Sequence, residues 1–223
     1  MRRWGIPYSR HGVPFLLLRT LKPGAPISLI DVGASDGEFA LSLARQYGLD
    51  RALLVEPQPA RAEQLRQLFS GSDFVVAQTA LSNERGELPM DILRWDYSSS
   101  LLPVDRTRVA VAKRVDLSVH ETITVPVTRL DDLCATTGFQ DTDLLKLDVQ
   151  GAELLVLRGS DRILGNTRFV LTEVSFQPYY VGGATFDEVL AHLRGRGFRL
   201  LGLSEGFRDA AGELVEGDAL FGR

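Results

Sequence analysis

The alternation of short apolar runs with helically spaced apolar residues constrains the fold of this chain more than any other feature. In the first third, apolar runs lie at 27–30, 52–55 and 74–77, and helical patterns lie between them at 38–47 and 60–69. Such alternation is typical of parallel strands joined by crossover helices. We therefore predict an α/β fold with a mostly parallel sheet and helices on both faces.

The same alternation returns in the last third of the chain. Apolar runs at 144–147 and 169–174 flank a predicted helix at 152–164, and another helix is predicted at 186–193. The spacing of apolar residues in this last helix is i, i+3, i+4 and i+7, which buries one face.

The chain ends in a predicted hairpin. Residues 199–203 and 219–221 are candidate strands, and the charged, glycine-containing residues 208–212 are the expected connection. Strands joined by a hairpin run antiparallel, so we expect the last strand to be antiparallel in the sheet.

Two segments do not follow this alternation. Residues 81–128 carry turn signals and short alternating stretches, which predict an insertion of short strands and loops. The first 25 residues lack a strand pattern, and we expect a helix there that acts as a lid or as the contact of a homodimer. The predicted organisation is an N-terminal segment, 1–25, followed by one domain, 26–223.

Composition excludes several classes of protein. Cys134 is the single cysteine of 223 residues, which excludes an internal disulfide framework and a cysteine-rich zinc module. The 25 basic and 29 acidic residues leave a net charge of −4, which argues against a nucleic-acid partner. No apolar run approaches the roughly 18 residues of a membrane helix, and the N-terminus lacks the pattern of a signal peptide. We therefore expect a cytoplasmic protein with no membrane partner.

A glycine-containing loop follows the first predicted strand directly. It begins at Asp31, holds Gly33 and Gly37, and leads into a helix, while Glu56 ends the second strand. In open α/β sheets ligands bind at the carboxyl ends of the strands, and an acidic residue at the second strand end grips ribose hydroxyls. Glycine lets the backbone approach such a ligand closely. The pattern predicts a cofactor that contains adenosine.

The loop favours a cationic cofactor over a dinucleotide. A dinucleotide site uses G-x-G-x-x-G around a pyrophosphate. Here Ser35 stands where the middle glycine should be, and the loop carries two acidic residues. Acidic groups suit the sulfonium and ammonium groups of S-adenosylmethionine (SAM). A nicotinamide or flavin dinucleotide, and a tight turn that binds no cofactor, are the alternatives.

Acidic residues also lie at the ends of two later strands. Asp148 should face the same cleft as the glycine loop. A buried strand rarely carries an unpaired glutamate, so Glu173 either belongs to the site or pairs with Lys146. Glu153, in the first turn of the next helix, either contacts a ligand or stabilises the helix start.

Together these stretches resemble the FkbM family of SAM-dependent methyltransferases. The matching stretches are IDVGASDGEF (30–39), LVEPQP (54–59), TALSN (79–83), VPVTRLDDL (125–133), LLKLDVQGAELLVLRGS (144–160), LTEVSFQPYYVGGATFDEVLAHLRGRGF (171–198) and DALFGR (218–223). The resemblance implies a Rossmann-like class I methyltransferase fold of seven strands with the last antiparallel, and O-methylation of a metabolite or sugar. A metal-assisted sugar O-methyltransferase, a SAM-binding protein without catalysis and an NAD-dependent oxidoreductase are the alternatives.

The resemblance also implies the residues that bind SAM. Asp31, Gly33 and Gly37 would form the SAM loop, Glu56 the ribose clamp, and Asp148 the motif after the fourth strand. Four neighbours in the matching stretches are added as cofactor-binding residues: Ala34, Ser35, Pro57 and Ala80.

Methyl transfer to a hydroxyl group needs a base that takes the hydroxyl proton. We predict Asp148 or Glu173 for this role, with His120 and His11 as alternatives. The expected partner is a small-molecule or glycan acceptor. Its candidate binding residues, some of which would otherwise pack in the core or form turns, are Ser99, Gln150, Glu153, Tyr179, Tyr180 and His11. The carboxylates of residues 148, 153 and 173 could collect Mg²⁺, which we do not expect.

Overall fold

The structure is a computed structural model of the 223-residue chain, and it describes residues 17, 20–21, 26–94, 98–105 and 116–223. The main sheet has seven strands in the order β3-β2-β1-β7-β8-β10-β9. Their bounds are Val75–Ala77 (β3), Leu49–Val55 (β2), Ile27–Val32 (β1), Thr142–Leu147 (β7), Thr167–Ser175 (β8), Leu214–Gly222 (β10) and Arg199–Arg208 (β9).

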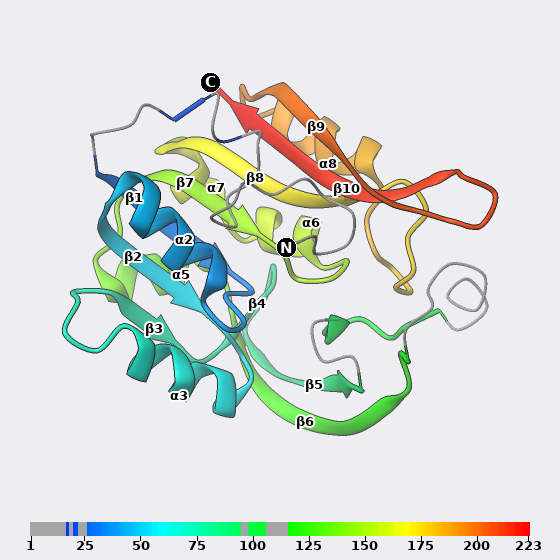
Figure 1. Ribbon diagram of the computed structural model, residues 1–223, viewed down its shortest axis with the longest axis horizontal. Coiled ribbons are helices and arrows are strands. Elements are labelled where there is room, and N and C mark those ends of the chain that lie inside the picture. Colours follow the sequence, from blue (N-terminus) through cyan, green and yellow to red (C-terminus); the bar gives the residue numbers. More distant parts are fainter. Residues whose placement is uncertain (1–16, 18–19, 22–25, 95–97, 106–115) are drawn as a thin grey trace.

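Strand direction follows the predicted pattern. The strands from β3 to β8 pair in parallel, and β10 is antiparallel to both of its neighbours. The fold is therefore a Rossmann-like α/β fold with a mostly parallel seven-stranded sheet whose last strand is antiparallel, as predicted. In Figure 1 the carboxyl ends of β2 and β7 point toward the middle of the molecule.

Helices cover both faces of this sheet. One hydrophobic cluster joins the sheet to α2 (Glu38–Tyr47) and α3 (Pro59–Leu68), and it also buries Leu17 and Leu21. The other cluster joins the opposite face to four helices: α5 (Leu130–Thr137), α6 (Glu153–Arg158), α7 (Asp161–Gly165) and α8 (Phe186–Arg194). The lid or dimer contact predicted for residues 1–25 falls mostly outside the described residues.

The helix predicted at 152–164 is divided into α6 and α7, which corrects that prediction. Gly159 lies at the break, where an added Cβ would stand 2.3 Å from the backbone oxygen of Ser82. The carboxylate of Asp131 then accepts hydrogen bonds from the amides of Arg162 and Ile163, at 2.9 Å each. These contacts start a new helix, because the first amides of a helix need acceptors outside it.

Residues 80–128 contribute a second, three-stranded sheet in the order β4-β6-β5. Its strands are Ala80–Leu81 (β4), Gly86–Leu93 (β5) and Val119–Thr128 (β6), and a small hydrophobic cluster lies on one face. Figure 1 shows this sheet at the lower right, beside the carboxyl ends of the main-sheet strands. The insertion therefore adjoins the edge of the main sheet where ligands bind in open α/β folds.

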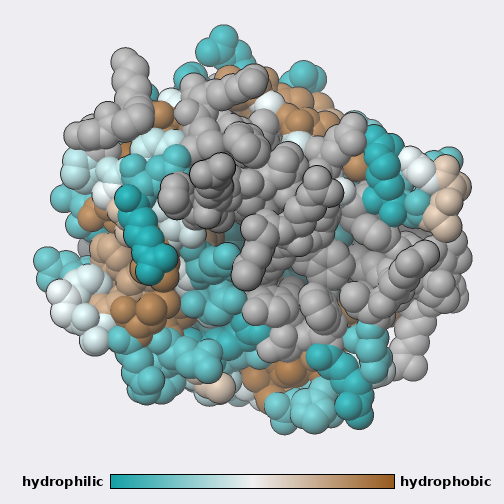
Figure 2. All heavy atoms as spheres, in the orientation of Figure 1, coloured by the Kyte–Doolittle hydropathy of each residue, from teal (hydrophilic) through white to brown (hydrophobic). Residues whose placement is uncertain are grey.

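The described surface is mixed in character. Figure 2 shows hydrophilic side chains in the central part of the face that is drawn, between hydrophobic patches at its left and lower edges. Among the described helices, none is both long enough and apolar enough to cross a membrane.

Candidate active site

The loop after β1 lies directly against the loop after β7. Gly33, Ser35 and Gly37 all have positive φ, at 79°, 53° and 79°. A Cβ on Gly33 would stand 2.0 Å from the backbone oxygen of Asp148, so only glycine allows this approach. The two strand ends that carry the predicted acidic residues are thereby brought together.

Glu56 holds the glycine loop from the end of β2. Its Oε2 accepts a hydrogen bond from the Ser35 amide at 3.0 Å, and its Oε1 accepts one from the Gln58 amide at 2.9 Å. Burial raises the pKa of Glu56, while these amides and the nearby charges of Arg61 and Lys146 oppose that rise. The carboxylate is fixed between two loops at the place predicted for a ribose clamp.

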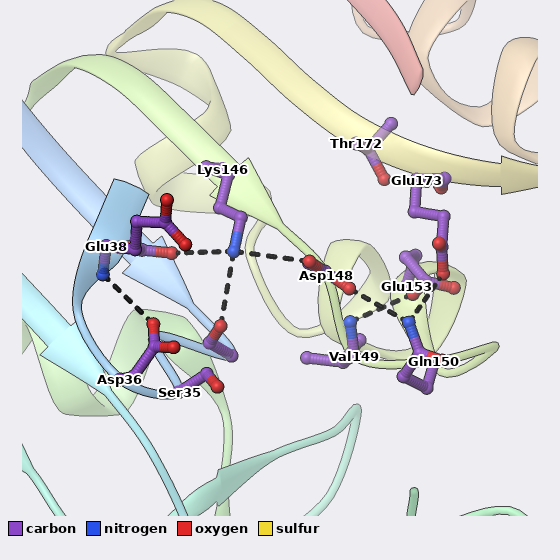
Figure 3. A network of polar contacts seen from close by, with 12 residues as sticks. Ser35, Asp36, Glu38, Lys146, Asp148, Val149, Gln150, Glu153, Thr172 and Glu173 are labelled. Carbon is purple, nitrogen blue, oxygen red and sulfur yellow. Dashed lines mark hydrogen bonds and ion pairs between the residues drawn. The ribbon is translucent and has the colours of Figure 1, made fainter. Parts of the chain in front are cut away.

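Lys146 lies at the centre of the site. Its Nζ is 3.1 Å from Asp31 Oδ1 and 3.6 Å from Asp148 Oδ2, and it donates a hydrogen bond to the Gly33 oxygen at 3.2 Å (Figure 3). The predicted alternative, a pair between Lys146 and Glu173, is thus replaced by pairs with Asp31 and Asp148. The reason is position, because Asp31 pairs with Lys146 across adjacent strands.

Gln150 joins the two candidate bases. Its Nε2 donates hydrogen bonds to Asp148 Oδ1 at 3.0 Å and to Glu173 Oε2 at 2.9 Å. Its Oε1 accepts from the Tyr180 hydroxyl at 3.1 Å, and its backbone oxygen accepts from Ser100 at 2.8 Å. Figure 3 shows Asp148 and Glu173 converging on this amide. Gln150 therefore links β7, β8 and the insertion.

Glu153 binds its own loop. Its Oε1 accepts hydrogen bonds from the amides of Val149 and Gly151, at 3.0 and 3.2 Å, and the residue is 5% exposed. The structure thus places Glu153 in the scaffold of the loop that carries Asp148 and Gln150. Of the two roles predicted for Glu153, local stabilisation describes this geometry better than a contact with an acceptor.

Replacing Glu153 with glutamine should flatten the pH dependence of stability. Burial, with help from the charge of Asp148, raises the pKa of Glu153 to about 7 against the opposing effect of its backbone hydrogen bonds. The folded-state pKa therefore lies above the unfolded value of about 4.3. Protonation of Glu153 therefore stabilises the folded state relative to the unfolded state. This stabilisation is complete below the unfolded pKa and is lost as the pH rises through about 7.

Glutamine keeps one oxygen for both amides and cannot ionise. Urea unfolding of Glu153→Gln at about pH 5 and about pH 8 should therefore show a smaller loss of unfolding free energy than the wild type. An equal loss in both proteins would contradict a role for Glu153 in this pH range.

A cavity opens between the main sheet and the insertion, with about 650 Å³ of empty space. This volume includes space that is open to solvent. Eight of the predicted site residues line it: Gly33, Ser35, Glu56, Pro57, Ala80, Ser99, Asp148 and Gln150. Further lining residues that were not predicted include Gln58, Arg61, Thr79, Met90 and Leu101.

Other predicted residues lie behind this lining. Asp31, Ala34, Gly37 and Glu173 are not lining residues of the cavity, and Asp31 and Ala34 are buried. Tyr179 and Tyr180 are buried in a cluster with Val215, so the core alternative describes them better than an acceptor pocket.

The two histidines predicted as alternative bases are not among these residues. His120 is exposed on β6 and is not a lining residue of the cavity, because the inward positions of this strand are Val125 and Val127. His11 lies outside the described residues. The structure therefore leaves carboxylates as the candidate bases in its described part.

Two cations near the cavity, Lys146 and Arg61, were not predicted as site residues. Arg61 is 9% exposed, lines the cavity and hydrogen bonds to the Ser35 hydroxyl. Its position five residues after Glu56, in the first turns of α3, was the signal in the sequence that could have identified it.

Among the described residues, no three His, Cys, Asp or Glu side chains are grouped to hold a metal ion.

Solved structures share this fold. The chain aligns with magnesium protoporphyrin IX methyltransferase (ChlM) from Synechocystis PCC 6803 with a TM-score of 0.51 and 9% identity, covering 94% of this chain and 74% of that one. Fibrillarin from Aeropyrum pernix, in complex with SAM, aligns with a TM-score of 0.51 and 13% identity over 92% of this chain and 72% of that one. Both support the class I methyltransferase fold.

Sequence relatives are closer. The chain is 30% identical over 218 residues to 31-O-demethyl-FK506 methyltransferase FkbM of Streptomyces tacrolimicus, covering 87% of this chain and 78% of that protein. It is 29% identical over 170 residues to 2-O-methyltransferase NoeI of Sinorhizobium fredii, covering 73% and 69%. The family described as Methyltransferase FkbM domain matches residues 31–200. The chain therefore belongs to the FkbM family and is a SAM-dependent methyltransferase.

Proposed function

We propose that this protein methylates a hydroxyl group of a small-molecule metabolite or sugar. The observation that carries the proposal is one cavity that Glu56 lines from β2 and Asp148 lines from β7. The first group suits the ribose of SAM and the second suits the hydroxyl that is methylated. The names of the relatives NoeI and FkbM, a 2-O-methyltransferase and a 31-O-demethyl-FK506 methyltransferase, support a hydroxyl acceptor.

The lining of the cavity fits SAM. Glu56 can accept hydrogen bonds from ribose hydroxyls, and the close approach of Gly33 to the Asp148 loop leaves backbone in place of side chains beside the ligand. Leu81 and Met90 add apolar surface for a flat ring. When bound, SAM supplies a methyl group on a positively charged sulfur, which a hydroxyl oxygen displaces in line.

Asp148 is the proposed base. Its side chain is 34% exposed, with Oδ2 near Lys146 and Oδ1 accepting from Gln150. These two contacts orient the carboxylate without closing it off from the cavity, so it can take the proton of an acceptor hydroxyl. Glu173, held by the same Gln150 amide, is the second candidate base.

Two measurements test the proposal. Calorimetry with S-adenosylhomocysteine (SAH) should show binding, and at 100 times its Kd this ligand should stabilise the fold by about 2.7 kcal/mol. Labelled methyl groups should then pass from SAM to a hydroxylated acceptor in a panel of metabolites and sugars. Stabilisation by NAD with none by SAH would overturn the proposal, and so would transfer confined to amine or thiol acceptors.

A further inference from the structure

Asp218 lies beside the candidate bases on a strand that the mechanism above does not use. On β10 it pairs with Glu173 of β8 and with Ser204 of β9. Residues directly opposite in an antiparallel pair have Cβ atoms about 5 Å apart on the same face. The side chains of Asp218 and Glu173 therefore leave the sheet next to each other.

The register places this pair on the face that carries Lys146. Lys146 pairs with Leu171, and Leu171 pairs in turn with Leu220. Asp218 and Glu173 follow two residues further along, toward the carboxyl end of β8. Beyond the apolar Leu171–Leu220 pair, this face thus becomes polar at the edge of the sheet where ligands bind.

One oxygen of Asp218 lacks a partner. Within the described part of the chain, its Oδ2 is buried and makes no hydrogen bond. A buried polar atom without a partner is uncommon in native structures and calls for an explanation such as a ligand. Burial is the first cause that raises the pKa of Asp218, and the charge of Asp148 is the next. Asp218 therefore lies within the electrostatic reach of the proposed base.

We propose that Asp218 is an acceptor-binding residue, whose carboxyl oxygen accepts a hydrogen bond from a hydroxyl group of the acceptor. Together with Asp148 and Glu173, it disfavours the binding of anionic acceptors. This inference rests on the proposed function, since it adds an acceptor side next to the cavity, whose lining residues do not include Asp218 or Glu173. In the part of the chain that the structure describes, the cation that acts on Asp218 is Lys146, which already contacts Asp31 and Asp148.

The charged groups around Asp218 favour neutral acceptors over anionic ones. Asp218 faces Lys146 and Asp148 from β7 and its loop, Glu173 from β8, Ser204 from β9 and Glu216 from its own strand. Among the described residues around Asp218 the carboxylates outnumber the lysine, so an acceptor that brings a further negative charge meets repulsion from them. A neutral acceptor rich in hydroxyl groups can instead donate hydrogen bonds to these oxygens.

The test compares SAH-loaded wild type with Asp218→Asn and with Asp187→Asn as a matched control. Asp187 is exposed on α8 and has no part in the site. The probes are neutral methyl hexosides and the matching methyl hexuronosides, which differ by one carboxylate, and binding is measured by ligand-detected NMR. Wild type should bind a neutral hexoside at least tenfold more tightly than its hexuronoside.

Asp218→Asn should lose at least tenfold in hexoside affinity, while its Kd for SAH stays within twofold of wild type. Asp218→Ser is the second variant, should the first fail to fold. Unchanged hexoside affinity in the folded variant, equal binding of hexuronosides by wild type, or failure of every hexoside to bind would each overturn the inference. Failure of wild type to bind SAH would instead overturn the proposed function.

Discussion

Replacing Lys146 with methionine should lower the free energy of unfolding by about 3–5 kcal/mol, the usual cost of removing one partner of a buried ion pair. The Lys146 side chain is 11% exposed, and the carboxylate of Asp31 beside it is fully buried. Methionine fills similar volume but leaves the Asp31 carboxylate without this cation. It also removes the hydrogen bond to the Gly33 oxygen, which ties β7 to the glycine loop.

Urea unfolding measures this loss, and two further variants locate its cause. Arg85→Met removes an exposed pair in which Arg85 Nε lies 2.8 Å from Asp132 and the arginine side chain is 71% exposed. That control should lose about 1 kcal/mol or less. The double variant Asp31→Asn/Lys146→Met should recover part of the loss, because the buried carboxylate that Lys146 contacts is then neutral. A loss in Lys146→Met no larger than in Arg85→Met would contradict the central role of this lysine.

The parts of the site that the sequence could predict are those carried by strand ends. Asp31, Glu56 and Asp148 follow apolar runs directly, and parallel strands deliver their carboxyl ends to one edge of a sheet. The positive φ at Gly33 explains why the loop carries glycine there. Local pattern and topology were sufficient to name these three residues, of which Glu56 and Asp148 line the cavity.

The parts that could not be predicted depend on register and on side-chain direction. The partner of Lys146 is decided by which residue of β1 stands opposite it, and an isolated sequence does not contain that register. For Glu153 the sequence left open a ligand contact or stabilisation of the helix start, and only the structure shows that its carboxylate turns back to two amides of its own loop. Asp218 begins the matching stretch DALFGR, but that stretch gave it no role, because its charged neighbours come from β7 and β8.

Replacing Glu56 with glutamine should weaken SAH binding by about 1.5–3 kcal/mol, or roughly 10–150-fold in Kd, as expected for charge-assisted hydrogen bonds. The two oxygens of Glu56 accept from different amides, those of Ser35 and Gln58. Glutamine turns one of these oxygens into a donor that faces an N–H group. The clamp then loses both its charge and one of the contacts that orient it.

Calorimetry with SAH measures the change, with Glu63→Gln as the matched control. Glu63 is exposed on α3 and lies near Arg66 at 3.4 Å on the helix surface. The control should bind SAH as the wild type does. Equal affinity in Glu56→Gln and wild type would show that the ribose is held elsewhere, while lost folding without SAH would show a structural role for Glu56.

The pH dependence of SAH affinity separates a charged clamp from a neutral one. Burial raises the pKa of Glu56 above 4.5, so its charge is complete well above that pH and disappears as the solution is acidified through the raised value. Wild-type affinity should therefore decline with acidification before an ordinary glutamate would be protonated. Glu56→Gln carries no titrating group at this position, and its weaker affinity should change less over the same range. A parallel decline in both proteins would assign the pH effect to another carboxylate of the cavity, with Asp148 the first to replace.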